Sequence, residues 1–243
     1  MSPFIPSDDV QFSGDHKDLL DRFGVMAFER QCVLTELIHG QPWNLDAVSG
    51  EISFSDKIRA EIQLIGSFAK EDQSWMWAWA NEDSSHPPSL LLQSLRMKEI
   101  GESNGSLQLT TPLFGAAEIV GHMFSLIASG MFGADGYYPA DYGQGLLFVT
   151  LSSPQIEEVA ASRQHLVPNV FSQFIMTFPA NHRKAFRYYV SAKGFAVEEN
   201  GKHITATRSS EEFVAEFDDL DRFISFKGRL TAPPPKKKKW WFF

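Results

Sequence analysis

The chain has 243 residues, of which 43% are hydrophobic and 13% aromatic, so it can bury a full core and is predicted to be globular rather than disordered. Its net charge is −8, and residues 1–152 alone hold 8 Lys and Arg against 20 Asp and Glu, a net charge of −12. An acidic surface of this kind repels nucleic-acid phosphates, so we expect no nucleic-acid partner. The same charge either attracts a basic protein partner or serves only solubility.

The single cysteine, Cys32, excludes a disulfide framework and a cysteine-based metal site, and a reducing compartment is expected. The first ten residues, MSPFIPSDDV, have neither the basic region nor the apolar region of a secretory signal. We therefore expect a cytoplasmic protein.

Apolar side chains recur every three or four residues between residues 15 and 39, which predicts a long amphipathic helix that stops at Gly40. Residues 43–48, 51–55 and 58–68 then have the pattern of strands, and a fourth strand begins at Ser74. Together these segments predict an antiparallel meander of four strands behind one helix.

Three of the six tryptophans, Trp75, Trp77 and Trp79, alternate along the fourth strand. Alternate residues of a strand share one face, so the three indoles are expected to form a stripe with apolar residues on the opposite face, as in a strand covered on both sides. Asn81 is expected to close the strand in a turn. The stripe is either core packing, the favoured interpretation, or an aromatic platform that binds a sugar, a base or a cation.

Residues 91–100 predict a modest helix and residues 107–111 a short strand. The apolar segment at residues 113–134 is about as long as a membrane span, but Glu118 and His122 lie inside it. A charge at the centre of a membrane helix costs roughly 2.5–3.5 kcal/mol, so we predict a buried helix instead.

That helix has polar residues at positions i, i+4, i+7 and i+11, namely Glu118, His122, Ser125 and Ser129, which places them on one face. They either line a polar pocket in which Glu118 and His122 act as an acid/base dyad, or Glu118 and His122 form an internally satisfied pair. No third group is visible in the sequence, so the satisfied pair is favoured. Small residues at every fourth position also allow close helix packing, which would account for the two serines.

Residues 130–143 are rich in Gly, Tyr and Asp, a composition typical of binding loops. Asp135, Tyr137, Tyr138 and Tyr142 are its candidate contact residues. The alternative is an ordered connection in which Asp135 and the glycine after it are merely a turn. A buried strand follows at residues 144–151.

Ser153 and the proline after it predict a new helix and a boundary between lobes. Pro168 divides or kinks that helix, Asn181 is expected to cap another, and two hairpins follow, the first around Asn200 and Gly201. We predict an α+β fold of antiparallel β-meanders packed by helices. It comprises an acidic lobe (residues 1–152), a second lobe (residues 153–232) and a tail (residues 233–243).

Two motifs link the tryptophan strand and the Gly/Tyr segment to a known family. A glycine precedes a W-x-W-x-W-A-N strand, and an apolar helix then leads into G-x-x-G-A-D-x-Y-Y. On these motifs, residues 17–150 resemble a bacterial family known only as a domain of unknown function. The resemblance implies a bacterial origin, no established activity, and contact in space between the two motifs. The matching residues are Gly66, Trp75, Trp77, Trp79, Ala80, Asn81, Gly130, Gly133, Ala134, Asp135, Tyr137 and Tyr138.

Sequence signatures of common active sites are absent: the chain has no Gly-rich phosphate loop, no zinc-binding His-Glu-x-x-His and no dinucleotide fingerprint. We therefore expect no cofactor, no metal and no catalytic residue. The predicted function is non-catalytic binding of a protein partner through the acidic lobe, by analogy with bacterial immunity proteins that neutralise basic toxins. The alternative is an enzyme or small-molecule binder with a pocket around His122, Glu118 and Asp135.

The tail joins three prolines to four lysines and four aromatic residues, which predicts a stiff spacer followed by an attachment segment. Lysines attract anionic headgroups and aromatic rings favour the headgroup boundary, so the tail is expected to contact an anionic membrane peripherally. The alternatives are a peptide that docks into a partner's groove and an inert disordered tail. The attachment residues are Lys236, Lys237, Lys238, Lys239, Trp240, Trp241, Phe242 and Phe243.

Overall fold

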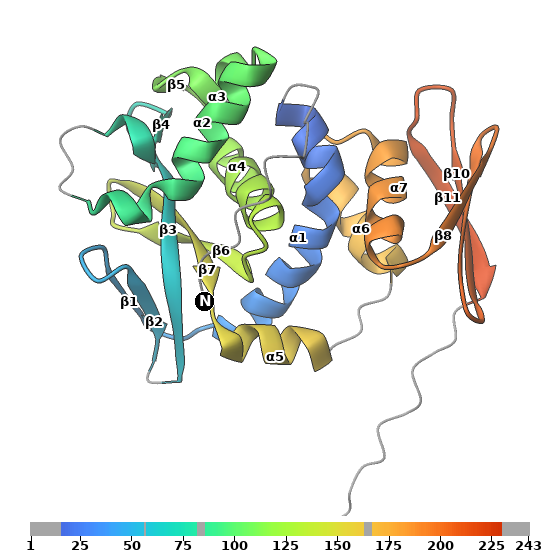
Figure 1. The fold of residues 1–243 in the computed structure, drawn as a ribbon, viewed down its shortest axis with the longest axis horizontal. Coiled ribbons are helices and arrows are strands. Elements are labelled where there is room, and N and C mark those ends of the chain that lie inside the picture. Colours follow the sequence, from blue (N-terminus) through green and yellow to red (C-terminus); the bar gives the residue numbers. More distant parts are fainter. Residues whose placement is uncertain (1–15, 56, 82–85, 163–166, 230–243) are drawn as a thin grey trace, which may run out of the picture.

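The computed structural model describes residues 16–55, 57–81, 86–162 and 167–229, and these form an α+β structure with two antiparallel sheets on either side of a group of helices (Figure 1). The predicted tail lies outside the described residues. The helices are α1 (His16–Ile38), α2 (Leu92–Asn104), α3 (Leu107–Thr110), α4 (Glu118–Met131), α5 (Pro154–Ser162), α6 (Val167–Thr177) and α7 (His182–Ala192).

The first sheet contains the predicted four-stranded meander, which is confirmed, together with three later strands. Its strands are β1 (Trp43–Asp46), β2 (Glu51–Phe54), β3 (Ile58–Ala69), β4 (Ser74–Trp77), β5 (Leu113–Gly115), β6 (Gly136–Asp141) and β7 (Gly145–Ser152). The second sheet has the order β11-β10-β9-β8, from the strands β8 (Ala196–Asn200), β9 (His203–Arg208), β10 (Glu211–Phe217) and β11 (Phe223–Arg229).

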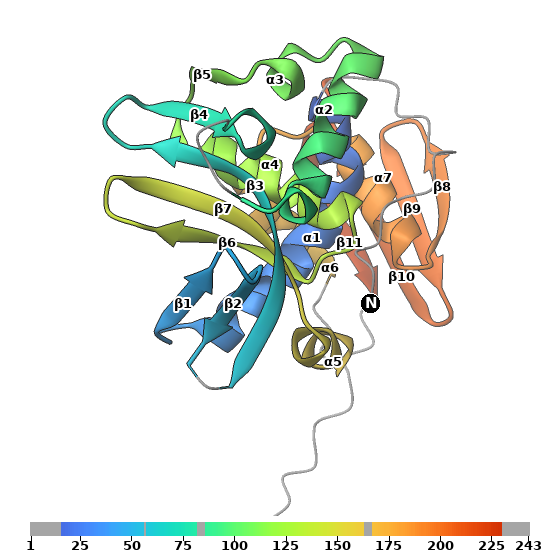
Figure 2. The ribbon, with the colours of Figure 1, turned by 60° about the vertical axis from the view of Figure 1, so that its left-hand side comes forward.

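Strand β3 is the axis of the first sheet. Near its start Glu61 pairs with both β2 and β7, and further along Gly66 pairs with both β4 and β7. One edge of β3 therefore carries β2 and β4 in succession, and the other edge carries β7. The sheet curls (Figure 2), so that the outer strands β1 and β6 approach each other where the rings of Trp43 and Tyr138 meet at 5.6 Å between centroids.

The tryptophan strand is shorter than predicted. Strand β4 ends at Trp77, and residues Ala78–Ala80 form a 3-10 turn, so Trp79 does not continue the stripe. Trp75 and Trp77 are completely buried, and the ring of Trp75 lies across Gly66, where a Cβ would clash with it. Two of the three indoles are therefore core, while Trp79 is only partly buried.

The expected strand at residues 107–111 is wrong, because these residues form the helical turn α3. Backbone hydrogen bonds close this turn from Leu109 N to Ser106 O (3.2 Å) and from Thr111 N to Leu107 O (2.8 Å). The strand that pairs with β4 is instead β5, and the apolar segment becomes helical only at Glu118.

The expectation that residues 130–143 form a loop is also wrong for part of that segment, while their role in binding stays a prediction. Residues Gly136–Asp141 form strand β6, which pairs with β7 over its whole length. The free edge of β6 is covered by helix α1, because the side-chain amide of Gln31 donates to Tyr137 O (3.0 Å) and accepts from Tyr137 N (2.9 Å). Gln31 thus takes the place of a neighbouring strand at an otherwise open edge.

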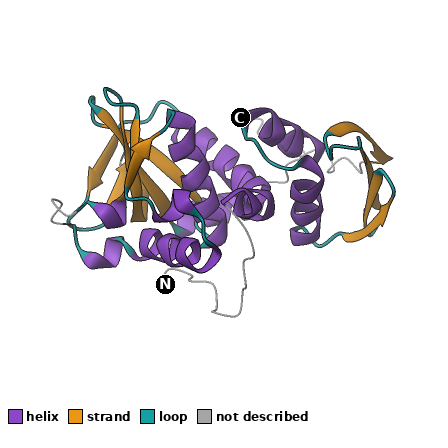
Figure 3. Ribbon diagram, turned by 90° about the horizontal axis from the view of Figure 1, so that it is seen from above, coloured by secondary structure: helices purple, strands orange, loops and turns teal. Residues whose placement is uncertain are grey.

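The elements after residue 152 follow the sequence closely. The side-chain oxygen of Asn181 caps α7 by accepting from Lys184 N at 2.9 Å. The predicted hairpin of β8 and β9 is present, but its turn is shifted by one residue: Asn200 ends β8 and pairs with His203, so Gly201 and Lys202 form the turn. Helix α1 packs against both α4 and α7, and one apolar cluster continues from Phe124 to Phe186, between the two sheets (Figure 3). The boundary near residue 152 stays a prediction. Within the described residues, no helix is both long and apolar enough to cross a membrane.

Candidate functional site

The predicted pair of Glu118 and His122 is present at the start of α4. Glu118 Oε1 lies 3.6 Å from His122 Nε2, and the other ring nitrogen, Nδ1, lies 3.0 Å from the hydroxyl of Tyr137. Burial lowers the pKa of His122, and the hydrogen bond and charge of Glu118 partly offset that effect. Tyr137 is the third group that the sequence did not reveal. The imidazole is held between these two partners and against the ring of Phe148 (5.1 Å), while the Glu118 side chain is half exposed, so the pair lies at the edge of the core rather than inside it.

The two serines of the predicted polar stripe do not extend this network. Ser125 and Ser129 are completely buried, and neither hydroxyl has a hydrogen-bond partner in the structure. Nearby Gly121 packs so closely that an added Cβ would lie 2.6 Å from the ring of Phe148. Close packing of small residues therefore accounts for the serines.

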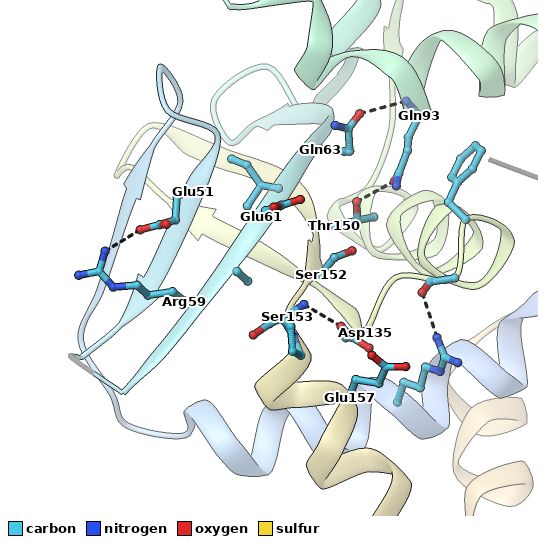
Figure 4. A pocket seen from close by; sticks show the side chains of 16 residues that line it. Glu51, Arg59, Glu61, Gln63, Gln93, Asp135, Thr150, Ser152, Ser153 and Glu157 are labelled. Atoms are coloured by element: carbon cyan, nitrogen blue, oxygen red, sulfur yellow. Dashed lines mark hydrogen bonds and ion pairs between the residues drawn. The ribbon is translucent and has the colours of Figure 1, made fainter. Parts of the chain in front are cut away.

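Asp135 lies at a different place, in a cavity of about 560 Å³ where α5 begins (Figure 4). The walls come from β2, β3 and β7, from α1 and the start of α2, from the link between α4 and β6, and from α5. His122 does not line this cavity, so the pocket predicted around His122, Glu118 and Asp135 is divided between two sites. The lining includes Arg30, Glu51, Arg59, Glu61, Gln63, Gln93, Phe132, Asp135, Thr150, Ser152, Ser153 and Glu157.

Asp135 is held rigidly. Its backbone N–H donates to Leu151 O (2.8 Å), and its Oδ2 accepts from the backbone N–H of Ser153 (2.8 Å). Burial raises the pKa of Asp135, and the charge of Glu157 raises it further, whereas the Ser153 N–H and the charge of Arg30 lower it. Asp135 is therefore a fixed acidic group at the start of α5 rather than part of a mobile loop.

The cavity has more acidic than basic groups. Four carboxylates and two guanidinium groups line it, but Arg59 pairs with Glu51 (3.0 Å) and Arg30 donates to the carbonyls of Gly133 (3.2 Å) and Ala134 (3.1 Å). In the part of the chain that the structure describes, Glu61, Asp135 and Glu157 form no ion pair with a basic side chain. These three carboxylates can therefore accept hydrogen bonds from a positively charged group.

One wall of the cavity is a buried polar network. The Thr150 hydroxyl donates to Gln93 Oε1 (2.7 Å), and the Gln93 backbone N–H donates to Gln63 Oε1 (3.3 Å). Gln63 is fixed in turn, because its Nε2 donates to Ser89 O (2.8 Å). The hydroxyl of Ser153 is different: the residue is only 3% exposed and its Oγ has no partner. A buried hydroxyl without a partner costs free energy unless a ligand satisfies it.

The other predicted contact residues lie elsewhere. Asn81 and Tyr142 line a second cavity of about 250 Å³ beside Trp77, so the tryptophan strand and the β6–β7 hairpin meet in space as expected. Tyr138 packs against Phe54 at 5.0 Å between ring centroids. Among the described residues, no group of three or more His, Cys, Asp and Glu side chains could hold a metal ion.

Comparison with known families agrees with the predicted resemblance. The model of a family of unknown function, DUF6882, matches residues 17–154. The chain belongs to this family. The DUF6882 region contains the tryptophan strand, the cavity residues up to Ser153, and the Glu118–His122 pair, whereas α6, α7 and the second sheet lie outside it. No curated protein and no solved structure matches the chain.

Sequence reasoning missed most of the cavity. Glu61, Gln63, Gln93 and Thr150 carry no motif, and each looks like an ordinary strand or helix residue in the sequence. Glu157 was visible only as an acidic residue in the first turn of a helix. The sequence offered one indirect signal of an acidic cavity: residues 101–152 contain no Lys or Arg that could pair with the carboxylates.

Proposed function

We propose that this DUF6882 protein is a non-catalytic binding module that receives a basic protein partner at the cavity around Asp135. The observation that carries the proposal is the set of three carboxylates, Glu61, Asp135 and Glu157, that share one cavity and form no ion pair within the described residues, although Arg30 and Arg59 also line it. Charges of one sign gathered in a recess focus the field there and speed the encounter with a partner of opposite sign. The net charge of −12 on residues 1–152 extends the same attraction over the lobe.

An immunity-like role, in which the chain neutralises a basic toxin in the bacterial cytoplasm, is one form of this proposal. The acidic lobe supports it, because close pairing of opposite charges across an interface gives fast association that weakens with salt. The rigid walls support it as well, since preformed sites bind without the cost of ordering a loop.

The test is selection of peptides from a random library displayed on phage, with the full chain as bait. We expect the enriched peptides to be rich in Lys and Arg, and their binding to weaken as the salt concentration rises. A double variant, Glu61→Gln with Glu157→Gln, should weaken binding about threefold to tenfold, because both carboxylates are exposed and each lost ion pair costs up to about 1 kcal/mol.

Glu158→Gln is the matched control, because Glu158 follows Glu157 on α5, is exposed and does not line the cavity. It removes one charge from the same helix and should leave the selected peptides bound. Peptides without basic residues, or basic peptides that bind the double variant as well as the wild type, would refute the proposal.

We also propose that the tail, residues 233–243, attaches the protein peripherally to an anionic membrane. Four lysines, each worth about 1 kcal/mol near an anionic leaflet, and four aromatic residues support this. Co-sedimentation with anionic vesicles at low and high salt should retain the full chain and lose a chain that ends at Ala232. Equal binding of the two chains, or binding that needs no anionic lipid, would remove the membrane from the proposal.

A further inference from the structure

We infer that the cavity around Asp135 takes the guanidinium group of an arginine side chain, in preference to a lysine ammonium. This inference rests on the proposed function and specifies which basic group the partner supplies. The cavity of about 560 Å³ is large enough for a long side chain together with its flanking backbone.

Carboxylate acceptors reach the cavity from three different elements. Glu61 approaches the cavity from β3, Asp135 from the link before β6, and Glu157 from the first turns of α5 (Figure 4). A guanidinium has five N–H donors in a planar fork, so it can donate to carboxylates on several sides at once. A lysine ammonium is a compact point charge with three donors, and it satisfies fewer of these separated acceptors.

Another feature of the cavity is the hydroxyl of Ser153. This residue is 3% exposed, lines the cavity, and its Oγ has no partner in the free protein, while its own N–H is already committed to Asp135. Ser125 and Ser129 also lack a partner for their hydroxyls, but Ser153 differs from them in lining the cavity. A donor bound in the cavity beside Asp135 is therefore the group that would satisfy the Ser153 hydroxyl.

The cavity has an open side and a buried inner wall. Glu61 and Glu157 are exposed, whereas Gln93, Thr150 and Phe132 in the lining are only 3%, 2% and 2% exposed. A guanidinium is more weakly hydrated than an ammonium, so it loses less on approaching this inner wall.

The experiment uses three small probes: N-acetyl-arginine amide, N-acetyl-lysine amide and the uncharged N-acetyl-citrulline amide. Each is titrated into the full ¹⁵N-labelled chain, and amide shifts are followed by NMR. We expect the arginine probe to bind saturably and shift the amides of Asp135 and Ser153. The lysine probe should bind about fivefold or more weakly, and the citrulline probe should cause no comparable shifts.

Two variants make the assignment specific. Ser153→Ala removes a hydroxyl that has no partner in the free protein, so the melting temperature should not fall, yet the arginine probe should bind about threefold or more weakly. Glu157→Gln should weaken the arginine probe further, and Glu158→Gln should not.

Equal affinity for the arginine and lysine probes, or arginine binding that neither variant changes, would overturn the inference. The proposed function would still hold in that case if the selected peptides are basic and bind more weakly to the variant that lacks the Glu61 and Glu157 carboxylates. Selected peptides that ignore both carboxylates would remove the proposed function, and the inference with it.

Discussion

The completely buried indole of Trp77 provides the most direct test of how the first sheet is held to α4. Its ring lies 4.7 Å from that of Phe124 and 5.4 Å from that of Trp75, centroid to centroid, and its Nε1 donates to Gln108 O at 2.9 Å. Truncation of a buried Trp to Ala costs about 3–5 kcal/mol, and the unpaired carbonyl of Gln108 adds about 1 kcal/mol. We therefore expect Trp77→Ala to lower the free energy of unfolding by about 5 kcal/mol.

The assay is urea denaturation followed by far-UV circular dichroism, which does not depend on the fluorescence of the residue removed. Trp77→Phe keeps most of the ring and deletes only the donor, so it should cost about 1–2 kcal/mol and separate the hydrogen bond from the packing. Trp79→Ala is the matched control on the same segment, because Trp79 is partly exposed and its ring faces the ammonium of Lys98 at 4.6 Å. Its loss should cost about 1 kcal/mol.

A Trp77→Ala variant that unfolds at the same urea concentration as the wild type would refute the assignment of Trp77 to the core. Equal costs for Trp77→Ala and Trp79→Ala would refute the separation of the predicted stripe into two buried indoles and one peripheral indole.

Three further predictions concern contacts of α1 and β6. Burial raises the pKa of Asp21 to about 6, above its ordinary 3.8, so its ionisation in the folded state costs up to about 3 kcal/mol. The protonated Asp21 carboxyl avoids this cost, so its contribution to the free energy of unfolding is fully present below pH 3.8 and is lost as the pH rises through 6. Asp21→Asn removes the titrating group, so the variant should gain less unfolding free energy than the wild type when the pH falls from 7 to 5. Gln31→Ala should cost about 2 kcal/mol and speed hydrogen exchange of the Tyr137 amide, because both backbone groups of Tyr137 lose their partner. Tyr137→Phe should cost about 1 kcal/mol and change the NMR titration of the His122 ring; an unchanged titration would contradict the contact.

Local signals predicted the helices and hairpins whose ends are set by their own residues. Asn181 caps α7 with its own side chain, and the two-residue turn at Gly201 and Lys202, in which Gly201 has a positive φ of 56°, joins β8 to β9. In α1 the apolar residues fall at helical spacing over 23 residues, long enough for the pattern to be unambiguous. These elements could be predicted because the deciding interactions lie within a few residues in sequence.

The elements that were mispredicted are decided by distant partners. Strand β6 exists because β7 pairs with it on one side and Gln31 bonds to Tyr137 on the other, more than a hundred residues away in sequence. The turn at residues 107–110 is too short for periodicity to separate helix from strand. Likewise Trp79 leaves the stripe because β3 and β4 pair only from Gly66 to Ala69, opposite Ser74 to Trp77.

Strand register explains why Asp135 and His122, which the sequence placed in one candidate pocket, lie apart. Gly136 pairs with Leu151 at the start of β6, which brings the preceding residue, Asp135, to the end of β7, where its carboxylate reaches the N–H of Ser153. The same register turns Tyr137 to α4, so Tyr137 rather than Asp135 meets His122. Side chains alternate between the faces of a strand, so a shift of one residue in the pairing of β6 with β7 would turn Tyr137 away from α4. The composition of residues 130–143 shows which polar and aromatic side chains are present, but only the pairing of β6 with β7 places each of them at the cavity or in the core.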